Sequence, residues 1–386
     1  MPERKKDYVI DVAARRKYRN QTEEYQKRYH EWRTDPSNPF GYSFIHDSRV
    51  RTYVDGEGYY EETADTNERH ALVNCYRLAG FTMLIMIAVT FVRYAVMQLA
   101  FGIGYAGRAY YSEMNSGARG LTDTQAYSLL ALNLLEYLLP ILFMRAATRM
   151  PSKIGVPLKK SKGSTASAVL MMLVIMSIGR IYNHVCAEVL GKTLKVDIPY
   201  FDYIRAESST ATVVCGICQH LVLAILIEIL LRGFMLQLFR QFGDSFAVIV
   251  TSVAGCFMLY DLSMIGYIFC VGLFTGTITI RSGSIKNACI MRITSRIVTY
   301  FLTFSSGLLD KKTATIMELT VYLIIFISSV FVYMRINSRR RWTFGTGNSG
   351  SSLSTGEKIR LMLLSPFFWI WAVSGFVMSL LLVKSL

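Results

Sequence analysis

Nine long runs of apolar residues set the strongest limit on what this chain can fold into. About 20 apolar residues are needed to cross the roughly 30 Å of hydrocarbon in a bilayer. Each run is close to that length or longer, so the sequence predicts an all-α polytopic membrane helix bundle of about nine spans. The predicted spans lie near 77–104, 126–147, 165–190, 209–238, 245–262, 264–281, 285–306, 314–334 and 360–383.

Composition supports a membrane protein and argues against a nucleic-acid binder. The chain is 52% hydrophobic and carries a net charge of +15, with a mean hydropathy of +0.33, above the usual range of soluble domains. Acidic and basic residues nearly balance over residues 1–70, so the basic excess belongs to residues 71–386. We therefore expect a cytoplasmic, charged and aromatic N-terminal region at 1–70 and a membrane domain at 71–386.

Positive charge in the loops predicts the topology. Four alternate connections are basic, namely RMPSKIGVPLKKSKG, FRQFGD, RSGSIK and RINSRRRWTFGTGNSGSSLSTGEKIR. The connections between them mix both signs. By the positive-inside rule the N-terminus lies in the cytoplasm and, with nine spans, the C-terminus lies outside the cell membrane. The first 70 residues have no short apolar core after a basic start, so no cleavable signal peptide is expected.

The segment ARRKYRNQTEEYQKRYHEWR places aromatic residues at near-helical spacing among lysines and arginines. Tyr18, Tyr25, Tyr29 and Trp32 would share a face. This pattern is typical of an interfacial helix on an anionic cytoplasmic leaflet. The alternative is a segment that docks on a protein partner.

Ionisable residues inside predicted spans are costly, by roughly 2.5 to 3.5 kcal/mol each, so each one raises the question of its partner. Glu228 and Arg232 stand four apart in LIEILLRGF and can pair on one helical face. The alternative makes Glu228 a buried general base, which would need a hydrogen-bonding partner and a route for water. The other candidates are Arg93, Glu136, Arg180, His184, Glu188, His220, Asp261, Arg292 and Arg296.

The stretch from Ile225 to Arg296 resembles the CPBP family of intramembrane proteases, which includes the CAAX prenyl endopeptidases and the Abi or bacteriocin-immunity proteins. The family pattern is E-E-x-x-x-R with G-F, then F-x-x-x-H, then G-L-x-x-G with a T-G-S-I-like turn, then H-x-x-x-N. The corresponding pieces here are IEILLRGF, FMLYD, GLFTG with RSGSI, and RITSR. The resemblance places a CPBP-like core at about 209–306.

The chain departs from this pattern at the family's chemical positions. Ile227 stands where the family has its first glutamate. In active members of the family, that glutamate looks like the base that activates water. The second glutamate and the arginine are retained as Glu228 and Arg232. Asp261, Arg292 and Arg296 replace two histidines and an asparagine. We expect a salt bridge between Asp261 and Arg292 to fill the old site, with Arg296 near Glu228 or a lipid phosphate. Asp261→Ala should then destabilise the fold more than the double variant with Arg292→Met.

Glu136, beside the helix-kinking Pro140, and His220 are the candidates for a relocated catalytic site. His184 and Glu188 have the i, i+4 spacing of metal ligands, but an intrahelical pair explains them with fewer assumptions. Arg180 would close onto Glu188 or lipid headgroups. Gly272 and Gly276 form a small-residue pattern that lets helices approach closely. We expect no cofactor and no metal.

Three functions remain open on the sequence. The first is a catalytically impaired CAAX-protease-like protein that binds a prenylated or transmembrane peptide, or a partner membrane protein, with membrane lipids around it. The resemblance implies protease-accessory or bacteriocin-immunity roles for such a protein. The second is an active intramembrane endopeptidase that uses Glu228 in a rearranged site. The third, a transporter, would call for internal repeats, and the sequence shows none.

Overall fold

The helices of a computed structural model account for most of the chain. The structure describes residues 8–10, 23–35, 38–42, 44–46, 64–101, 122–158, 165–194, 196–197, 210–258, 265–306, 309–337, 353–381 and 384–385. Asp261 and Tyr18, both singled out in the sequence, lie outside these residues. The side chains of His184, Glu188 and His220 are likewise outside the described part.

Every predicted span is found as a helix or a pair of helices. The long helices, in chain order, are α2 (Ala64–Phe101), α4 (Asp123–Thr148), α6 (Thr165–Leu194), α7 (Thr210–Glu228), α9 (Asp244–Cys256), α10 (Ile265–Ser282), α11 (Lys286–Ser306), α12 (Lys311–Asn337) and α14 (Pro366–Leu381). A π-helix, η2 (Ile229–Met235), continues α7 into α8 (Leu236–Arg240).

Shorter elements complete the described part of the chain. The remaining helices are α1 (Glu23–Thr34), α5 (Ser152–Gly155) and α13 (Thr355–Leu364). Strands β1 (Tyr8–Ile10) and β2 (Phe44–His46) pair antiparallel, as do β3 (Val196–Asp197) and β4 (Lys384–Ser385). These two- and three-residue ladders leave the architecture all-α.

Among the described residues, fewer helices are long and apolar enough to cross a membrane than the nine predicted spans. Six described helices are long and apolar enough to cross a membrane, and the bent pair of α13 and α14 would make a seventh. The two other predicted spans exist as helices but fall short for different reasons. Helix α9 has 13 residues, while α11 carries Lys286, Arg292 and Arg296 along its length. Both can lie inside the bundle because neighbouring helices cover them.

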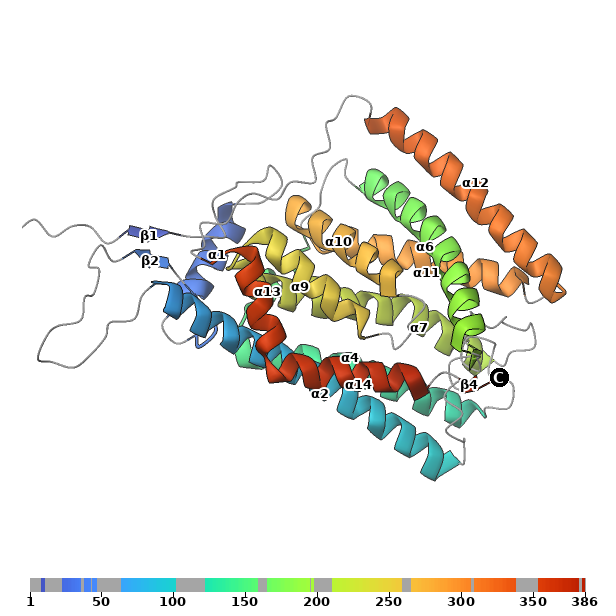
Figure 1. The fold of residues 1–386 in the computed structure, drawn as a ribbon, viewed down its shortest axis with the longest axis horizontal. Helices are drawn as coiled ribbons and strands as arrows, with labels where there is room; N and C mark the ends of the chain where they lie inside the picture. The colour runs from blue at the N-terminus through green and yellow to red at the C-terminus, as the bar shows by residue number, and fades with distance from the viewer. Residues whose placement is uncertain are drawn as a thin grey trace, which may run out of the picture.

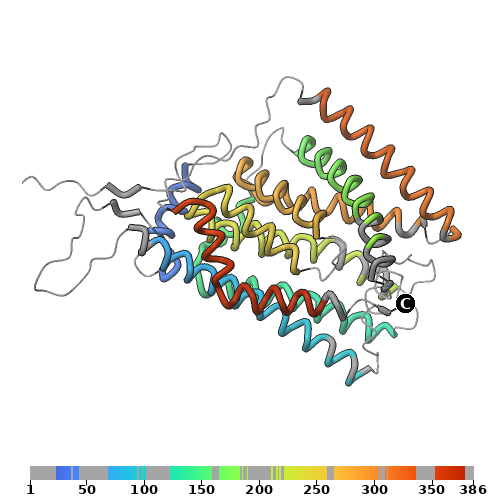
Figure 2. Tube along the Cα trace, in the orientation of Figure 1, coloured from blue at the N-terminus to red at the C-terminus, as the bar shows by residue number. Residues whose placement is uncertain are grey.

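The helices pack as a bundle with the predicted core in the middle (Figure 1). Helices α9, α10 and α11 lie between α2, α4 and α14 on one side and α6 and α12 on the other, and the tube trace shows the same order (Figure 2). Helix α7 contacts both α4 and α11, and α10 contacts α9, α11 and α6. Residues from α2, α4, α7, η2, α8 and α9 contribute most of the main buried apolar cluster.

The C-terminal span is broken. Helix α13 ends at Leu364, and α14 begins at Pro366 with an axis bent by 70°. The sequence explains the bend, since proline lacks a backbone N–H and disfavours a helical conformation in the residue before it. Buried Lys358 of α13 donates to the main-chain oxygen of Phe242 at 2.6 Å and lies 3.6 Å from Glu68 of α2. These contacts hold α13 against the end of the central helices.

The aromatic face of the N-terminal helix contacts protein, while the predicted placement of this helix on the lipid surface stays a prediction. Tyr25 donates to the Gln237 side chain at 2.6 Å, and Tyr29 donates to the Gln237 main-chain oxygen at 2.8 Å. Trp32 donates to the main-chain oxygen of Thr148 at 2.9 Å. Burial raises the pKa of Tyr25 above its ordinary value, against the lowering effect of Arg240. Helix α1 is therefore a cap on the end of α4 and α8.

The predicted boundary at residue 70 falls inside a helix. Helix α2 begins at Ala64, and Glu68 within it is fully buried against α13. Residues 38–42 also pack on the central core, since the Tyr42 ring stacks on Phe242 with ring centroids 5.5 Å apart. The described part of the N-terminal region is thus continuous with the bundle.

Candidate functional site

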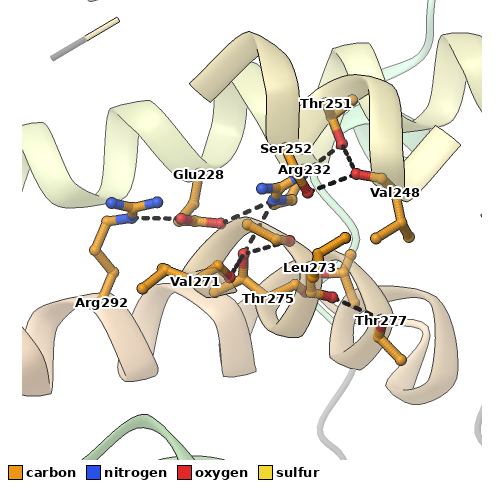
Figure 3. Close-up of polar contacts among 12 residues, drawn as sticks. Glu228, Arg232, Val248, Thr251, Ser252, Val271, Leu273, Thr275, Thr277 and Arg292 are labelled. Carbon is orange, nitrogen blue, oxygen red and sulfur yellow. Dashed lines mark hydrogen bonds and ion pairs between the residues drawn. The ribbon is translucent and has the colours of Figure 1, made fainter. Parts of the chain in front are cut away.

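The candidate site centres on Glu228, whose carboxylate lies between two guanidinium groups (Figure 3). Nε of Arg292 donates to Oε1 of Glu228 at 2.5 Å, and Nε of Arg232 lies 3.8 Å from Oε2. Glu228 and Arg232 are fully buried, and Arg292 is 6% exposed. The group therefore joins α7, η2 and α11 through one buried carboxylate.

Two threonines hold the guanidinium of Arg232 on its far side. Arg232 donates from Nε to Oγ1 of Thr275 at 3.0 Å and from Nη1 to Oγ1 of Thr251. Thr251 in turn donates to the main-chain oxygen of Ala247 at 2.8 Å. Arg232 thus links η2 to α9 and α10, and its N–H groups are directed at neighbouring helices (Figure 3).

Close helix approach makes room for these contacts. A Cβ built on Gly272 would lie 2.8 Å from the Ser252 Cβ and 2.9 Å from Nη2 of Arg232. One on Gly276 would lie 3.1 Å from Val248. The predicted close helix approach at Gly272 and Gly276 is confirmed, because α10 lies directly against α9 and Arg232. The π segment that carries Arg232 is a form of helix often found at functional sites.

The position of the family's first glutamate is part of the hydrophobic core. Ile227 is 6% exposed and belongs to the main apolar cluster, together with Leu223 and Leu226. No carboxylate stands there, so Glu228 is the acid that α7 brings to the site.

Arg292 has a partner that was not predicted for it. Arg292 contacts Glu228, whereas the proposed Asp261–Arg292 pair stays a prediction because Asp261 lies outside the described residues. The predicted Glu228–Arg232 pair is present but loose, at 3.8 Å. Arg296 lies one turn beyond Arg292 and lines a cavity with it. Arg292 therefore lies at Glu228, and the placement of Arg296 near Glu228 or a lipid phosphate stays a prediction.

Glu136, the acid proposed for a relocated site, is bound elsewhere. It pairs with Arg93 of α2 and accepts a hydrogen bond from Thr90 at 2.8 Å, while Arg93 also donates to Asn133 at 2.6 Å. Glu136 therefore ties α4 to α2. Among the described residues, no group of three or more His, Cys, Asp or Glu side chains is arranged to hold a metal ion.

Arg180 has a partner that the sequence pattern did not predict. It donates to Oε1 of Glu318 on α12 at 2.8 Å, and its guanidinium lies 5.8 Å from the centre of the Tyr322 ring. The predicted closure of Arg180 onto Glu188 or lipid headgroups stays a prediction, because the Glu188 side chain lies outside the described residues. Glu318 stands inside the predicted span 314–334, so the rule that a buried acid needs a partner could have found it.

The surroundings of Glu228 can be compared with what a general base requires. A general base must reach a water molecule and the bond to be cleaved. Glu228 is enclosed by protein, with Oε1 taken by Arg292. The family's histidine and asparagine positions near α11 carry cations, which cannot accept a proton from water.

Comparison with known proteins agrees with the predicted resemblance. Residues 209–298 match a family model described as type II CAAX prenyl endopeptidase Rce1-like, which confirms the CPBP assignment made for about 209–306. The match covers η2, α7 to α10 and half of α11, and it includes Glu228, Arg232, Arg292 and Arg296. No curated protein and no solved structure matches the chain.

Proposed function

We propose that this CAAX-protease-like membrane protein, whose residues 209–298 form its Rce1-like segment, binds a lipidated or transmembrane peptide without cleaving it. The observation that carries the proposal is the enclosure of Glu228 between Arg232 and Arg292. In this family the site residues would have to activate water, and here the acid lies between two buried cations instead. A partner membrane protein, as in an immunity or protease-accessory role, is the other occupant that the same site would accept.

The residues that replace the family's chemical groups, taken together, support the loss of hydrolysis. Peptide hydrolysis requires a base for water and a donor that stabilises the oxyanion. Ile227 supplies no base, and Arg292 has its Nε committed to Glu228. Replacing the third-motif imidazole by the guanidinium of Arg292 keeps hydrogen-bond donors but removes a group that exchanges protons near neutral pH. Binding of a ligand can persist under these changes, whereas turnover cannot.

The proposal is tested with purified protein and two fluorescent peptides of one sequence, with and without a farnesylated cysteine. We expect the farnesylated peptide to bind at least about tenfold more tightly, since each buried CH₂ contributes about 0.8 kcal/mol. We expect no cleavage product by mass spectrometry after prolonged incubation.

A matched variant identifies the source of any product. Glu228→Gln keeps the size of the side chain and removes its charge. Product that forms with the parent protein and disappears with this variant, in a sample that remains folded, would establish the active endopeptidase and overturn the proposal. Product that persists with Glu228→Gln would come from a contaminating protease. Equal affinity for the two peptides would contradict the binding of a lipidated ligand.

We further infer that the end of the bundle carrying α1, α5 and α13 faces the cytoplasm. Contacts of Trp32 with Thr148 and of Lys358 with Phe242 bring these elements to one end, where α1 and α13 also lie together in Figure 1. The basic connections come after α4 and α8 at this end. Strand β4 (Lys384–Ser385), near the C-terminus, lies at the opposite end (Figure 1), which supports an extracytoplasmic placement of the C-terminus.

The orientation is tested by cysteine labelling in sealed vesicles. Lys153 is an exposed residue of α5, and Asp310 is exposed in the connection before α12. With a membrane-impermeant maleimide, Lys153→Cys should be labelled in inverted vesicles and Asp310→Cys in right-side-out vesicles. The parent protein gives the background from its own cysteines. The reverse pattern would place the N-terminus outside.

A further inference from the structure

An open groove lies where the broken C-terminal span packs against α2. It has a volume of about 510 Å³ and lies between α2 and the elbow, residues 361–367, at which α13 turns into α14 (Figure 1). Its lining is apolar except for one cation and one hydroxyl. The lining residues are Val73 and Arg77 of α2, and Leu361, Leu364, Ser365, Pro366 and Phe367 of the elbow.

Close contacts between α2 and the C-terminal helices hold the walls of this groove. The Tyr76 hydroxyl donates to the main-chain oxygen of Lys358 at 2.8 Å. The Cβ of Phe367 lies directly against the backbone of Gly80, where any side chain would collide with it. The rings of Phe81 and Phe367 have centroids 4.6 Å apart. A ligand therefore meets a surface that is already formed.

The residues around the elbow are those expected at the depth of lipid headgroups. Helix α13 begins at an exposed capping box formed by Ser354 and Glu357, whereas α14 belongs to the apolar part of the broken span. Between these ends, Leu364 is 67% exposed and Trp369 is 52% exposed. Tryptophan is enriched where hydrocarbon meets the headgroups. This pattern is typical of a groove that opens at the boundary between the two.

Arg77 gives the groove a positive charge that no described residue neutralises. It is exposed and has no ion pair or hydrogen bond from its side chain among the described residues. The cations that join α2 to α13 are paired, in contrast. Arg69 lies 3.5 Å from Glu357, and Lys358 lies 3.6 Å from Glu68. Because no acidic residue lines the groove, an anion at Arg77 meets no carboxylate there.

The hydroxyl of Ser365 is a second, independent indication of a ligand. Ser365 is 6% exposed and lines the groove, and its hydroxyl makes no hydrogen bond to the described residues. Buried polar groups are normally hydrogen-bonded. Ser365 also directly precedes α14, which has no acidic residue in its first turn. The N-terminal end of a helix favours negative charge, above all phosphate.

From these observations we propose that the groove binds an anionic phospholipid, with its phosphate between Arg77 and Ser365. A guanidinium pairs with phosphate through two parallel hydrogen bonds, and the Ser365 hydroxyl donates to a further phosphate oxygen. One acyl chain lies against the apolar wall formed by Leu361, Leu364 and Phe367. A net negative headgroup is favoured because no carboxylate of the groove can pair with an ammonium group. This binding does not depend on peptide binding near Glu228.

The test measures the first lipid bound to the purified chain in neutral detergent by native mass spectrometry. Three lipids share two oleoyl chains. Dioleoyl phosphatidylglycerol carries a net negative phosphate, dioleoyl phosphatidylcholine carries a phosphate balanced by choline, and dioleoylglycerol carries none. We expect the phosphatidylglycerol to bind about tenfold or more tightly than dioleoylglycerol, and about threefold or more tightly than the phosphatidylcholine.

Two variants locate the phosphate. Arg77→Gln should weaken binding of the phosphatidylglycerol by about tenfold, and Ser365→Ala by about threefold. Neither side chain has a polar partner among the described residues, so both variants should keep the fold. The controls are Arg145→Gln, at an exposed arginine of α4, and Ser374→Ala, at a serine of α14 outside the groove. Both controls should leave binding unchanged.

Either of two results would overturn the proposal. In the first, the phosphatidylglycerol binds no more tightly than the phosphatidylcholine or dioleoylglycerol. In the second, folded Arg77→Gln or folded Ser365→Ala binds it as tightly as its control variant does, which would place the lipid elsewhere on the surface. Failure of the farnesylated peptide to bind leaves these results unaffected, so the two proposals fail separately.

Discussion

Replacing Glu228 with glutamine is expected to lower the free energy of unfolding by about 3 to 5 kcal/mol. The reason is that Arg292 and Arg232 both lose their opposing charge while they stay buried. The amide keeps the volume of the side chain, so lost packing contributes little. Unfolding of the purified protein in mixed detergent micelles measures the change.

A double-variant comparison separates pairing from other causes. Arg292→Met in the Glu228→Gln background removes one stranded cation and supplies an apolar side chain of similar length. The loss of unfolding free energy in the double variant should therefore be smaller than the sum of the losses in the two single variants, by about 1 kcal/mol or more. Glu24→Gln is the control, since Glu24 pairs with Arg28 at 2.6 Å on the exposed surface of α1. Glu24→Gln should lower the free energy of unfolding by about 0.5 kcal/mol or less. Additive costs, or a Glu228→Gln effect no larger than the control, would contradict the pairing.

Features that depend on spacing along one helix could be predicted from the sequence. The apolar runs predict the helices of the bundle, and the i, i+4 spacing of Glu228 and Arg232 places them on one face. The family motifs then identify Ile227 as a changed position, and the structure shows it in the apolar core. Each of these inferences needs only local geometry.

Partners on different helices could not be predicted in the same way. Arg180 and Glu318 are 138 residues apart, and Arg292 and Glu228 are 64 apart. Helical periodicity gives the face of each side chain but not the helix that it meets. For Arg180 the sequence predicts closure onto Glu188 of the same helix or onto lipid headgroups. Its contact with Glu318 depends on α6 packing against α12.

The N-terminal segment shows a second limit of sequence reasoning. An amphipathic helix with an aromatic face fits a lipid surface and a protein surface equally well. Residues that decide between them lie far away in sequence, at Thr148 and Gln237. Hydrogen-bond acceptors at the ends of α4 and α8 bind the aromatic residues of α1 in this structure.

The second large effect is expected from Trp32→Ala, which should release α1 from the end of the bundle. Trp32 is 6% exposed, donates to Thr148 and packs on Tyr29 with ring centroids 5.7 Å apart. Removing a buried aromatic side chain of this size costs about 3 to 5 kcal/mol. Amides of Glu23–Thr34 should then exchange with solvent much faster, measured by hydrogen exchange and mass spectrometry, while α9 and α10 remain protected.

Glu31→Ala provides the matched control on the same helix, because the Glu31 side chain is 59% exposed. It should leave exchange in α1 close to that of the parent protein. Unchanged protection of α1 in Trp32→Ala would contradict docking through this residue. Comparing detergent with vesicles that contain anionic lipid then separates protein docking from surface anchoring. If α1 is protected from exchange in both, the bundle itself holds α1, in agreement with its contacts with Gln237. Protection that appears only with anionic lipid would instead support an interfacial helix on the lipid surface.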